Sequence, residues 1–161
     1  MDKKLRIDLQ NVPQHVAVIM DGNGRWAKGK GMERVFGHRN ALNSVRDSIE
    51  GAAEIGVKAI TLYAFSTENW NRPKIEVNAL MKLLISSLKK ELPTFQKNEV
   101  KVNAVGNLNS LPKNAQKVLA EVIDDTKTNN RITLTLALSY GSREEIVNTI
   151  KNISKKVVNN Q

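Results

Sequence analysis

Strand-like and helix-like segments alternate four times along the 161 residues of this chain. Short apolar runs rich in β-branched residues predict strands at 16–20, 57–65, 99–105 and 131–138. Apolar residues at helical spacing predict helices at 38–55, from 77 to near Pro93, at 113–127 and at 142–158. This order is typical of an α/β fold with a parallel sheet and helices on both faces. We therefore expect a polar N-terminal arm at 1–14 and a single α/β domain at 15–161.

Sheets of this kind bind ligands beyond the carboxyl ends of their strands. The loops that follow the predicted strands are therefore the places to look for function, at 21–37, 66–75, 106–112 and 139–143. Basic residues and glycines are interspersed over 25–37, so we expect a loop there with a single helical turn.

The composition narrows the class of protein. Hydrophobic residues make up 40% of the chain, which is enough for a packed core rather than a disordered segment. The absence of cysteine excludes a disulfide framework and thiolate chemistry, and it suits a reducing cytoplasm. The N-terminus lacks the apolar region of a signal peptide, and no apolar run approaches the roughly 20 residues that span a bilayer. We expect a cytoplasmic protein that can also work at the membrane surface.

The formal net charge of +9 favours anionic partners, which are nucleic acid, phosphate esters or an anionic membrane. Simple solubility explains such a charge equally well. Aromatic residues are only 4% of the chain, too few for a series of base-stacking platforms, and no nucleic-acid-binding module is recognisable. We expect no nucleic-acid partner.

The loop after the first predicted strand has the features of a phosphate site. Asp21 ends that strand, and the glycines of Gly22-Asn23-Gly24 let the backbone turn and direct N–H groups at an anion. Arg25 adds a forked donor that suits phosphate oxygens. A carboxylate beside bound phosphate favours Mg²⁺. Further basic residues follow in the same connection: Lys28, Lys30, Arg34, His38 and Arg39. The alternative is an ordinary glycine turn among solvated charges.

Residues 22–27 also match the G-x-G-x-x-[GA] pattern of dinucleotide-binding loops. Two observations argue against that interpretation. The loop leads into a basic, glycine-spaced stretch rather than an apolar helix. The acidic residue expected about 20 positions later, at the end of a second strand, is missing.

The second loop, at 66–74, is polar and is followed by an aliphatic helix. The loop could be a substrate clamp that places Trp70 at the carboxyl edge of the sheet. It could equally be a plain surface loop with the amphipathic Trp70 packed beneath it. The helix behind it carries more apolar residues than one stripe needs: Leu80, Met81, Leu83, Leu84, Ile85 and Leu88. They fit either ordinary core packing or the wall of a tunnel for a hydrocarbon tail.

Four blocks of the sequence together resemble a known family. They are HVAVIMDGNGRWA at 15–27, R-x-x-G-H at Arg34–His38, TLYAFSTENWNRP at Thr61–Pro73, and SYGSR at Ser139–Arg143. The chain resembles, over residues 15 to about 155, the cis-prenyltransferases of the undecaprenyl diphosphate synthase type. Members condense isopentenyl diphosphate with an allylic diphosphate such as farnesyl diphosphate, and each new double bond is cis. The resemblance implies a parallel sheet, a hydrophobic tunnel, Mg²⁺ as cofactor and a homodimer, with peripheral membrane association through the lipid product.

The resemblance also implies roles for particular residues. Asp21 would position Mg²⁺ on the diphosphate, and Asp21 and Asn69 would be the catalytic residues. The allylic diphosphate would be held by Gly22, Asn23, Gly24, Arg25, Trp26, Arg34 and His38. The substrate loop would contribute Ser66, Thr67, Glu68, Asn69, Trp70 and Arg72. Leu80, Leu84 and Leu88 would lie on the tunnel side.

The sequence departs from the family pattern at three positions. Glu144 follows Arg143 where an aromatic residue is usual, Ser139 stands where Asn is usual, and Ala41 where Gly is usual. The resemblance further implies a segment beyond Gln161 that supplies arginines for isopentenyl diphosphate, a glutamate for Mg²⁺, C-terminal strands and much of the dimer interface. We therefore expect this chain to bind allylic diphosphate without elongating it. The alternative function is a non-catalytic binding fragment or partner subunit.

Overall fold

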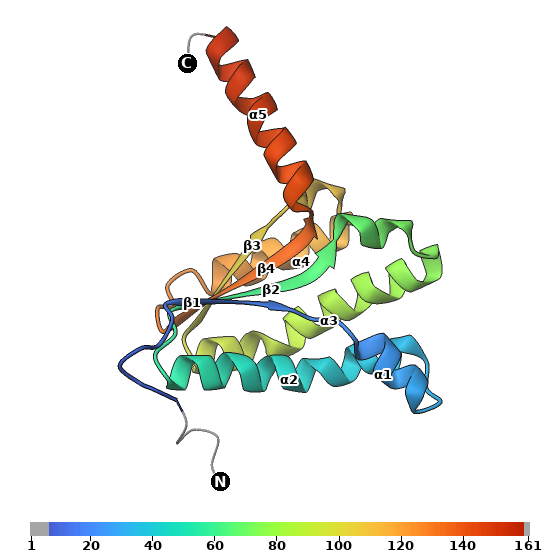
Figure 1. Cartoon of the computed structure of the whole chain (residues 1–161), viewed down its shortest axis with the longest axis vertical. Helices are drawn as coiled ribbons and strands as arrows, with labels where there is room; N and C mark the ends of the chain where they lie inside the picture. The colour runs from blue at the N-terminus through green and yellow to red at the C-terminus, as the bar shows by residue number, and fades with distance from the viewer. Residues whose placement is uncertain (1–6, 160–161) are drawn as a thin grey trace.

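The structure is a computed structural model that describes residues 7–159, apart from the side chains of Arg34, Val35, His38 and Arg39. Its centre is a sheet in the order β1-β2-β4-β3 in which every strand is parallel to its neighbours (Figure 1). The strands are β1 (His15–Ile19), β2 (Ala59–Ser66), β3 (Val100–Val105) and β4 (Ile132–Tyr140). These confirm the four predicted strands and the α/β class.

Helices connect the strands as the sequence pattern predicts. The α-helices are α1 (Asn23–Gly29), α2 (Arg34–Glu54), α3 (Lys74–Lys97), α4 (Lys113–Asp125) and α5 (Ser142–Val158). Two short 3₁₀ helices, η2 (Thr67–Asn71) and η3 (Leu108–Ser110), lie in the loops after β2 and β3. Both therefore stand at the carboxyl edge of the sheet.

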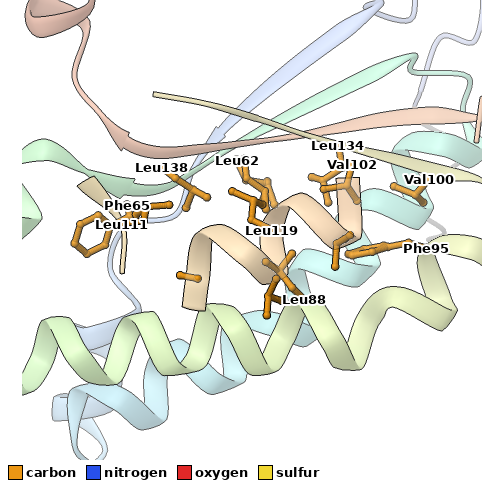
Figure 2. Packing of buried hydrophobic residues seen from close by; sticks show 14 of the residues in the cluster. Leu62, Phe65, Leu88, Phe95, Val100, Val102, Leu111, Leu119, Leu134 and Leu138 are labelled. Carbon is orange, nitrogen blue, oxygen red and sulfur yellow. The ribbon is translucent and has the colours of Figure 1, made fainter. Parts of the chain in front are cut away.

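The core fills the space between one face of the sheet and three helices. Alternate residues of the strands point inward, including Leu62, Val102 and Leu134, and pack with Leu88 of α3 and Leu119 of α4 (Figure 2). The residues between them in the strands point to the other face, where Thr61, Thr135 and Asn103 are partly or fully exposed. The period-2 alternation thus selects which face of the sheet is buried.

Helix α5 does not share this core. It leaves the carboxyl end of β4 and extends away from the body (Figure 1), and every residue from Ser142 to Asn159 is exposed. The predicted apolar side chains of this helix are therefore in water: Ile146, Val147, Ile150, Ile153 and Val157. We expected helices on both faces of the sheet, whereas α2, α3 and α4 all contribute to the cluster on the inward face. Among the described helices, none is long and apolar enough to cross a membrane.

Two predicted boundaries were wrong. Helix α3 continues through Pro93 to Lys97 instead of ending near the proline. Pro93 has no N–H, so the Lys89 carbonyl loses its helical partner. Both residues are exposed, so water can satisfy that carbonyl. The buried Phe95 holds the last turn of the helix against the core. Residues 25–37 contain the two-turn helix α1 and the start of α2 rather than a loop with one helical turn.

The Thr126 hydroxyl offers a test of how α4 is tied to the sheet. Thr126 is fully buried; its Oγ1 accepts the Val102 N–H at 3.0 Å and donates to the Val122 carbonyl at 2.7 Å. We predict that Thr126→Val, which keeps the volume but removes both bonds, lowers the free energy of unfolding by about 1–3 kcal/mol. Urea denaturation measures it. Thr126→Ser keeps the hydroxyl and should cost less; a larger loss for the serine variant would contradict the assignment.

Candidate functional site

A cavity of about 480 Å³ lies between the inward face of the sheet and helices α2 and α3. Polar groups line it where the strands end, namely Asp21, Asn23, Ser66, Asn69 and Arg72. Most of the remaining wall is apolar and comes from the strands, α2 and α3: Leu42, Val45, Leu62, Leu80, Met81, Leu83, Leu84, Leu88, Phe95, Leu134, Leu136 and Leu138. Ser87 and Glu91 of α3 are polar residues within this wall. One continuous space therefore joins a polar mouth to an apolar interior.

The direction of α3 gives this cavity its depth. The helix begins after η2 at the carboxyl edge and runs back to the start of β3, so Leu80, Leu84 and Leu88 lie at increasing distance from the mouth. Leu88 is buried, while Leu80 and Leu84 are only partly buried. At the α2–α3 boundary, the Arg46 guanidinium donates to both carboxylate oxygens of Glu91, at 3.0 and 2.5 Å. The surplus apolar width of α3 therefore lines a cavity, in agreement with the tunnel interpretation.

Asp21 stands at the mouth as an ionised carboxylate. Its Oδ1 accepts the Gly22 N–H at 2.6 Å, and its Oδ2 accepts Arg25 Nη2 at 2.9 Å. The Gly22 N–H and then Arg25, with a smaller contribution from Arg72, hold the pKa of Asp21 below its ordinary value. The side chain is 75% exposed, so it can reach a ligand or a hydrated cation from solvent.

The turn beside Asp21 is shaped by two glycines. Gly22 has a φ of 93°, in the left-handed region, and precedes the first residue of α1. Gly37 in α2 lies against α1 so closely that a Cβ there would overlap with the backbone carbonyl of Asn23. The Gly in the R-x-x-G-H block therefore fixes α2 against the turn that carries Gly22 and Asn23.

The loop after β2 supplies Asn69 and its neighbours. The Asn69 Oδ1 accepts the Ser66 N–H at 3.1 Å, which caps η2 and holds the amide group at the mouth. The exposed Glu68 has its pKa lowered by its own backbone N–H and by Ser66, with a smaller contribution from Arg143. Thr67 Oγ1 lies 3.3 Å from Glu68 Oε2. Arg72 donates to Glu76 at 2.8 Å and also lines the cavity.

Trp70 lies under the loop instead of standing free in solvent. Its ring meets Phe65 edge-on at 4.8 Å, and its Nε1–H donates to Ser139 Oγ at 2.9 Å. The side chain is partly buried. The structure agrees with the interpretation in which Trp70 packs beneath the loop and holds it in place.

Other predicted residues lie outside the cavity wall. Trp26 is 45% exposed, stacks on Phe36 with the ring centroids 6.4 Å apart, and has the Lys30 ammonium 4.6 Å from its ring centroid. Arg25 is near the mouth through its bond to Asp21. The side chains of Arg34 and His38 are outside the part of the chain that the structure describes, so their predicted roles stay predictions.

Sequence reasoning selected the segment at 139–143 but gave neither Ser139 nor Tyr140 a role in the site. Tyr140 lines the cavity, its ring lies 5.7 Å from that of Tyr63, and its hydroxyl donates to Glu145 at 2.8 Å, which raises the pKa of Tyr140. Ser139, which the sequence placed in the SYGSR block and marked as a departure from the family pattern, is buried and accepts the Trp70 Nε1–H. The signal that could have found both is their position directly at the end of a predicted strand.

Asp21 fits Mg²⁺ only as a single protein ligand. Among the described residues, no group of three His, Cys, Asp or Glu side chains could hold a metal ion. Mg²⁺ usually keeps several waters and is bound through one or two carboxylates together with substrate phosphates. One exposed, ionised carboxylate therefore fits a cation that arrives with a diphosphate, and does not form a cage by itself.

The fold and the cavity define a class: an α/β protein that can take a ligand with an anionic head at the sheet edge and an apolar tail inside. The Prenyltransf family model, which describes undecaprenyl diphosphate synthases, matches residues 19–161. The chain belongs to this family, which confirms the resemblance found in the sequence.

Curated relatives agree with the family assignment. The chain is 47% identical over 154 residues to an isoprenyl transferase of Clostridium tetani, covering 96% of this chain and 60% of that protein. It is 46% identical over 157 residues to a ditrans,polycis-undecaprenyl-diphosphate synthase, (2E,6E)-farnesyl-diphosphate specific, of Haemophilus ducreyi, covering 98% of this chain and 65% of that one. The chain therefore spans less than two thirds of the length of these relatives.

Solved structures share the fold. Lavandulyl diphosphate synthase from Lavandula x intermedia, in complex with dimethylallyl diphosphate, matches with a TM-score of 0.87 and 34% identity over 92% of this chain and 64% of that one. A probable undecaprenyl diphosphate synthase from Campylobacter jejuni matches with a TM-score of 0.73 and 32% identity, over 89% of this chain and 62% of that one.

The charge state of Asp21 can be measured directly. We predict that its carboxyl titrates below 3.8 in a carbon-detected NMR titration, and that Arg25→Ala raises the midpoint toward that ordinary value. Because the folded pKa is the lower one, the stabilisation is present above about 3.8 and is lost as pH falls through the folded pKa. Arg131→Ala, at the opposite edge of the sheet, is the control. An unchanged midpoint in Arg25→Ala would show that Arg25 does not act on Asp21.

Proposed function

We propose that the chain is the allylic-diphosphate-binding part of a cis-prenyltransferase. The reaction is the condensation of isopentenyl diphosphate with an allylic diphosphate, such as farnesyl diphosphate, to give a cis-polyprenyl diphosphate. The observation that carries the proposal is the single cavity that joins Asp21, Asn69 and Arg72 to the apolar wall of α3. An allylic diphosphate has this same division between a charged head and a hydrocarbon tail.

The head group would lie at the polar mouth. Arg72 lines it directly, and Arg25 stands beside it through Asp21. Breaking the allylic C–O bond puts negative charge on the departing diphosphate, and positioned cationic donors stabilise that charge as it develops. Gly22 and the first turn of α1, which begins at Asn23, would bring backbone N–H groups to the same anion. Asn69, held by its bond to Ser66, would orient the reacting substrates.

The tail would lie along α3 between Leu80 and Leu88. A cavity of about 480 Å³ is within the range of about 300–1,000 Å³ that small-molecule sites occupy. Its apolar lining keeps water from the allylic cation-like centre, which water would otherwise quench. The partly buried Leu80 and Leu84 are the side chains that a hydrocarbon chain would cover first.

Mg²⁺ belongs to this proposal as a companion of the diphosphate. When bound, it neutralises phosphate charge as a Lewis acid. Asp21 is the residue of this chain that would hold it, since its carboxylate is ionised and exposed. Asp21 would then exchange its contact with Arg25 for the cation, which leaves the guanidinium free for phosphate oxygens.

Several whole-protein properties are proposed on the strength of the relatives rather than of this cavity. They are elongation with isopentenyl diphosphate, a cytoplasmic location with access to the membrane surface through the lipid product, a role in making a cell-wall lipid carrier, and a homodimer. The names of the relatives, an isoprenyl transferase and an undecaprenyl-diphosphate synthase, support elongation. The location, the cell-wall role and the homodimer rest on the resemblance to the family. The solved relative in complex with dimethylallyl diphosphate supports the allylic substrate class.

Calorimetric titration with farnesyl thiolodiphosphate, which resists cleavage, tests the binding proposal. We predict that it binds in the presence of Mg²⁺ at least tenfold more tightly than the dimethylallyl analogue, because each buried CH₂ contributes up to about 0.8 kcal/mol. Asp21→Asn should remove the gain in affinity that Mg²⁺ gives. Asp47→Asn, an exposed carboxylate of α2, is the matched control.

Three results would contradict the proposal. They are equal affinities for the two analogues, equal binding of farnesol without its diphosphate, or an unchanged Mg²⁺ dependence in Asp21→Asn. Incorporation of labelled isopentenyl diphosphate with farnesyl diphosphate then separates the two candidate functions. Cis-polyprenyl product supports the transferase, whereas binding without product supports the non-catalytic binding fragment.

A further inference from the structure

Ser139 has an unusual backbone conformation for a buried residue. It is 3% exposed and has a φ of 49°, in the left-handed region that residues other than glycine, Asn and Asp rarely adopt. Such conformations are strained and persist where surrounding contacts hold them. The neighbouring backbone is also crowded, because a Cβ at Gly106 would overlap with the carbonyl of Leu138. The contacts of Ser139 therefore need to be accounted for one by one.

A chain of hydrogen bonds passes through the Ser139 hydroxyl. Trp70 Nε1–H can only donate, and it lies 2.9 Å from Ser139 Oγ. Ser139 Oγ lies 2.8 Å from Ser110 Oγ, and Ser110 Oγ lies 2.6 Å from the Asn107 carbonyl, which can only accept. Each hydroxyl has one proton, so the direction that satisfies every group runs from Trp70 to Ser139, to Ser110, to the Asn107 carbonyl.

The backbone of Ser139 makes a second link to the loop after β3. Its carbonyl accepts the Asn107 N–H at 3.1 Å. The loop that contains η3 is thus bound to Ser139 through both main chain and side chain. Gly141 then meets η2, since a Cβ there would lie 2.5 Å from Thr67 Oγ1. The end of β4 therefore holds the loops after β2 and β3 at fixed positions.

Trp70 sits between two residues of the cavity mouth. Asn69 precedes it and Arg72 follows two positions later, and both line the cavity, whereas Trp70 does not. Phe65 supports one side of the indole ring at 4.8 Å, and Ser139 fixes its polar end. A shift of the indole would carry Asn69 and Arg72 with it, because η2 is a single short turn.

We propose that Ser139 is a positioning residue: its hydroxyl, held in a strained backbone by the ends of β3 and β4, fixes Trp70 and thereby sets Asn69 and Arg72 at the cavity mouth. The inference rests on the proposed function for the role of the mouth in ligand binding. The hydrogen-bond relay itself is independent of that function. Ser139 touches no reacting group; it acts through Trp70.

Three variants separate the hydroxyl from the backbone strain. Ser139→Ala removes the hydroxyl and keeps the strain. Ser139→Gly removes both, because glycine adopts a positive φ freely. Ser139→Asn tolerates a positive φ and restores an acceptor, so it is the rescue variant. Ser48→Ala, an exposed serine on α2, is the matched surface control.

The first measurement is the indole N–H signal of Trp70 by NMR. The chain has two tryptophans, so Trp26, exposed and bonded to no part of this relay, is the internal reference. We expect the Trp70 signal to shift upfield and to exchange at least tenfold faster with solvent in Ser139→Ala and Ser139→Gly, and to stay near the parent position in Ser139→Asn. An unchanged Trp70 signal in Ser139→Ala, or a parent-like signal in Ser139→Gly, would overturn the proposal.

The second measurement is the affinity for farnesyl thiolodiphosphate. Loss of one hydrogen bond in the support of the mouth should weaken binding about 3- to 10-fold in the alanine and glycine variants, with recovery in Ser139→Asn. A moved indole signal with unchanged affinity would overturn the link from Ser139 to the mouth. If the parent chain does not bind the ligand, the proposed function fails, and amide exchange of Asn69 and the side-chain Nε exchange of Arg72 still decide the positioning claim.

Discussion

The parallel pairing of β2 with β1 on one side and β4 on the other is the constraint on which the site depends. Val18 is in register with Leu62, and Leu62 with Leu136, so the inward side chains of three strands form one wall. The same pairing brings Asp21, Ser66 and Ser139 to one edge of the sheet. A register slip of one residue would turn the apolar wall to solvent and remove the cavity.

The opposite wall comes from α2 and α3, and its composition decides whether the space stays open. Val77, Met81, Leu88 and Phe95 are buried and hold α3 in the core cluster. Leu80 and Leu84, one helical turn apart, are only partly buried and face the cavity. The Arg46–Glu91 pair is bonded twice at the α2–α3 boundary, where it keeps two helices together without filling the space with apolar side chains. Packing and ligand binding are thus divided among residues of a single helix.

Sequence periodicity was sufficient for the sheet and the longer helices because their apolar residues repeat over several turns. It also located Asp21 and Asn69 correctly at the sheet edge, since both follow predicted strands. It failed where structure depends on contacts between distant residues. Helix α1 is short and polar, and its packing depends on the fit of Gly37 against Asn23, which no local pattern reveals. Pro93 predicts a helix end from sequence alone, because its exposure is a property of the folded chain.

The relay through Ser139 shows the same limit at the site. The Trp70–Ser139 bond joins residues 69 positions apart. The Ser139–Ser110 bond joins residues 29 positions apart. Their residue types carry no signal by themselves, and the strain at Ser139 exists only in the folded backbone. The apolar face of α5 is the opposite case. Its helical pattern was predicted correctly, yet all its described residues are exposed and none belongs to the core cluster.

The central claim is that one ligand occupies the polar mouth and the apolar cavity at the same time. NMR spectra of the chain with labelled leucine methyls and backbone amides, recorded with farnesyl thiolodiphosphate and Mg²⁺, test it most directly. The account predicts simultaneous shifts of the Gly22 and Asn69 amides and of the Leu84 and Leu88 methyls, while the dimethylallyl analogue moves the two amides and leaves Leu88 unchanged. Shifts at the mouth with both leucines unchanged under the farnesyl ligand would contradict it.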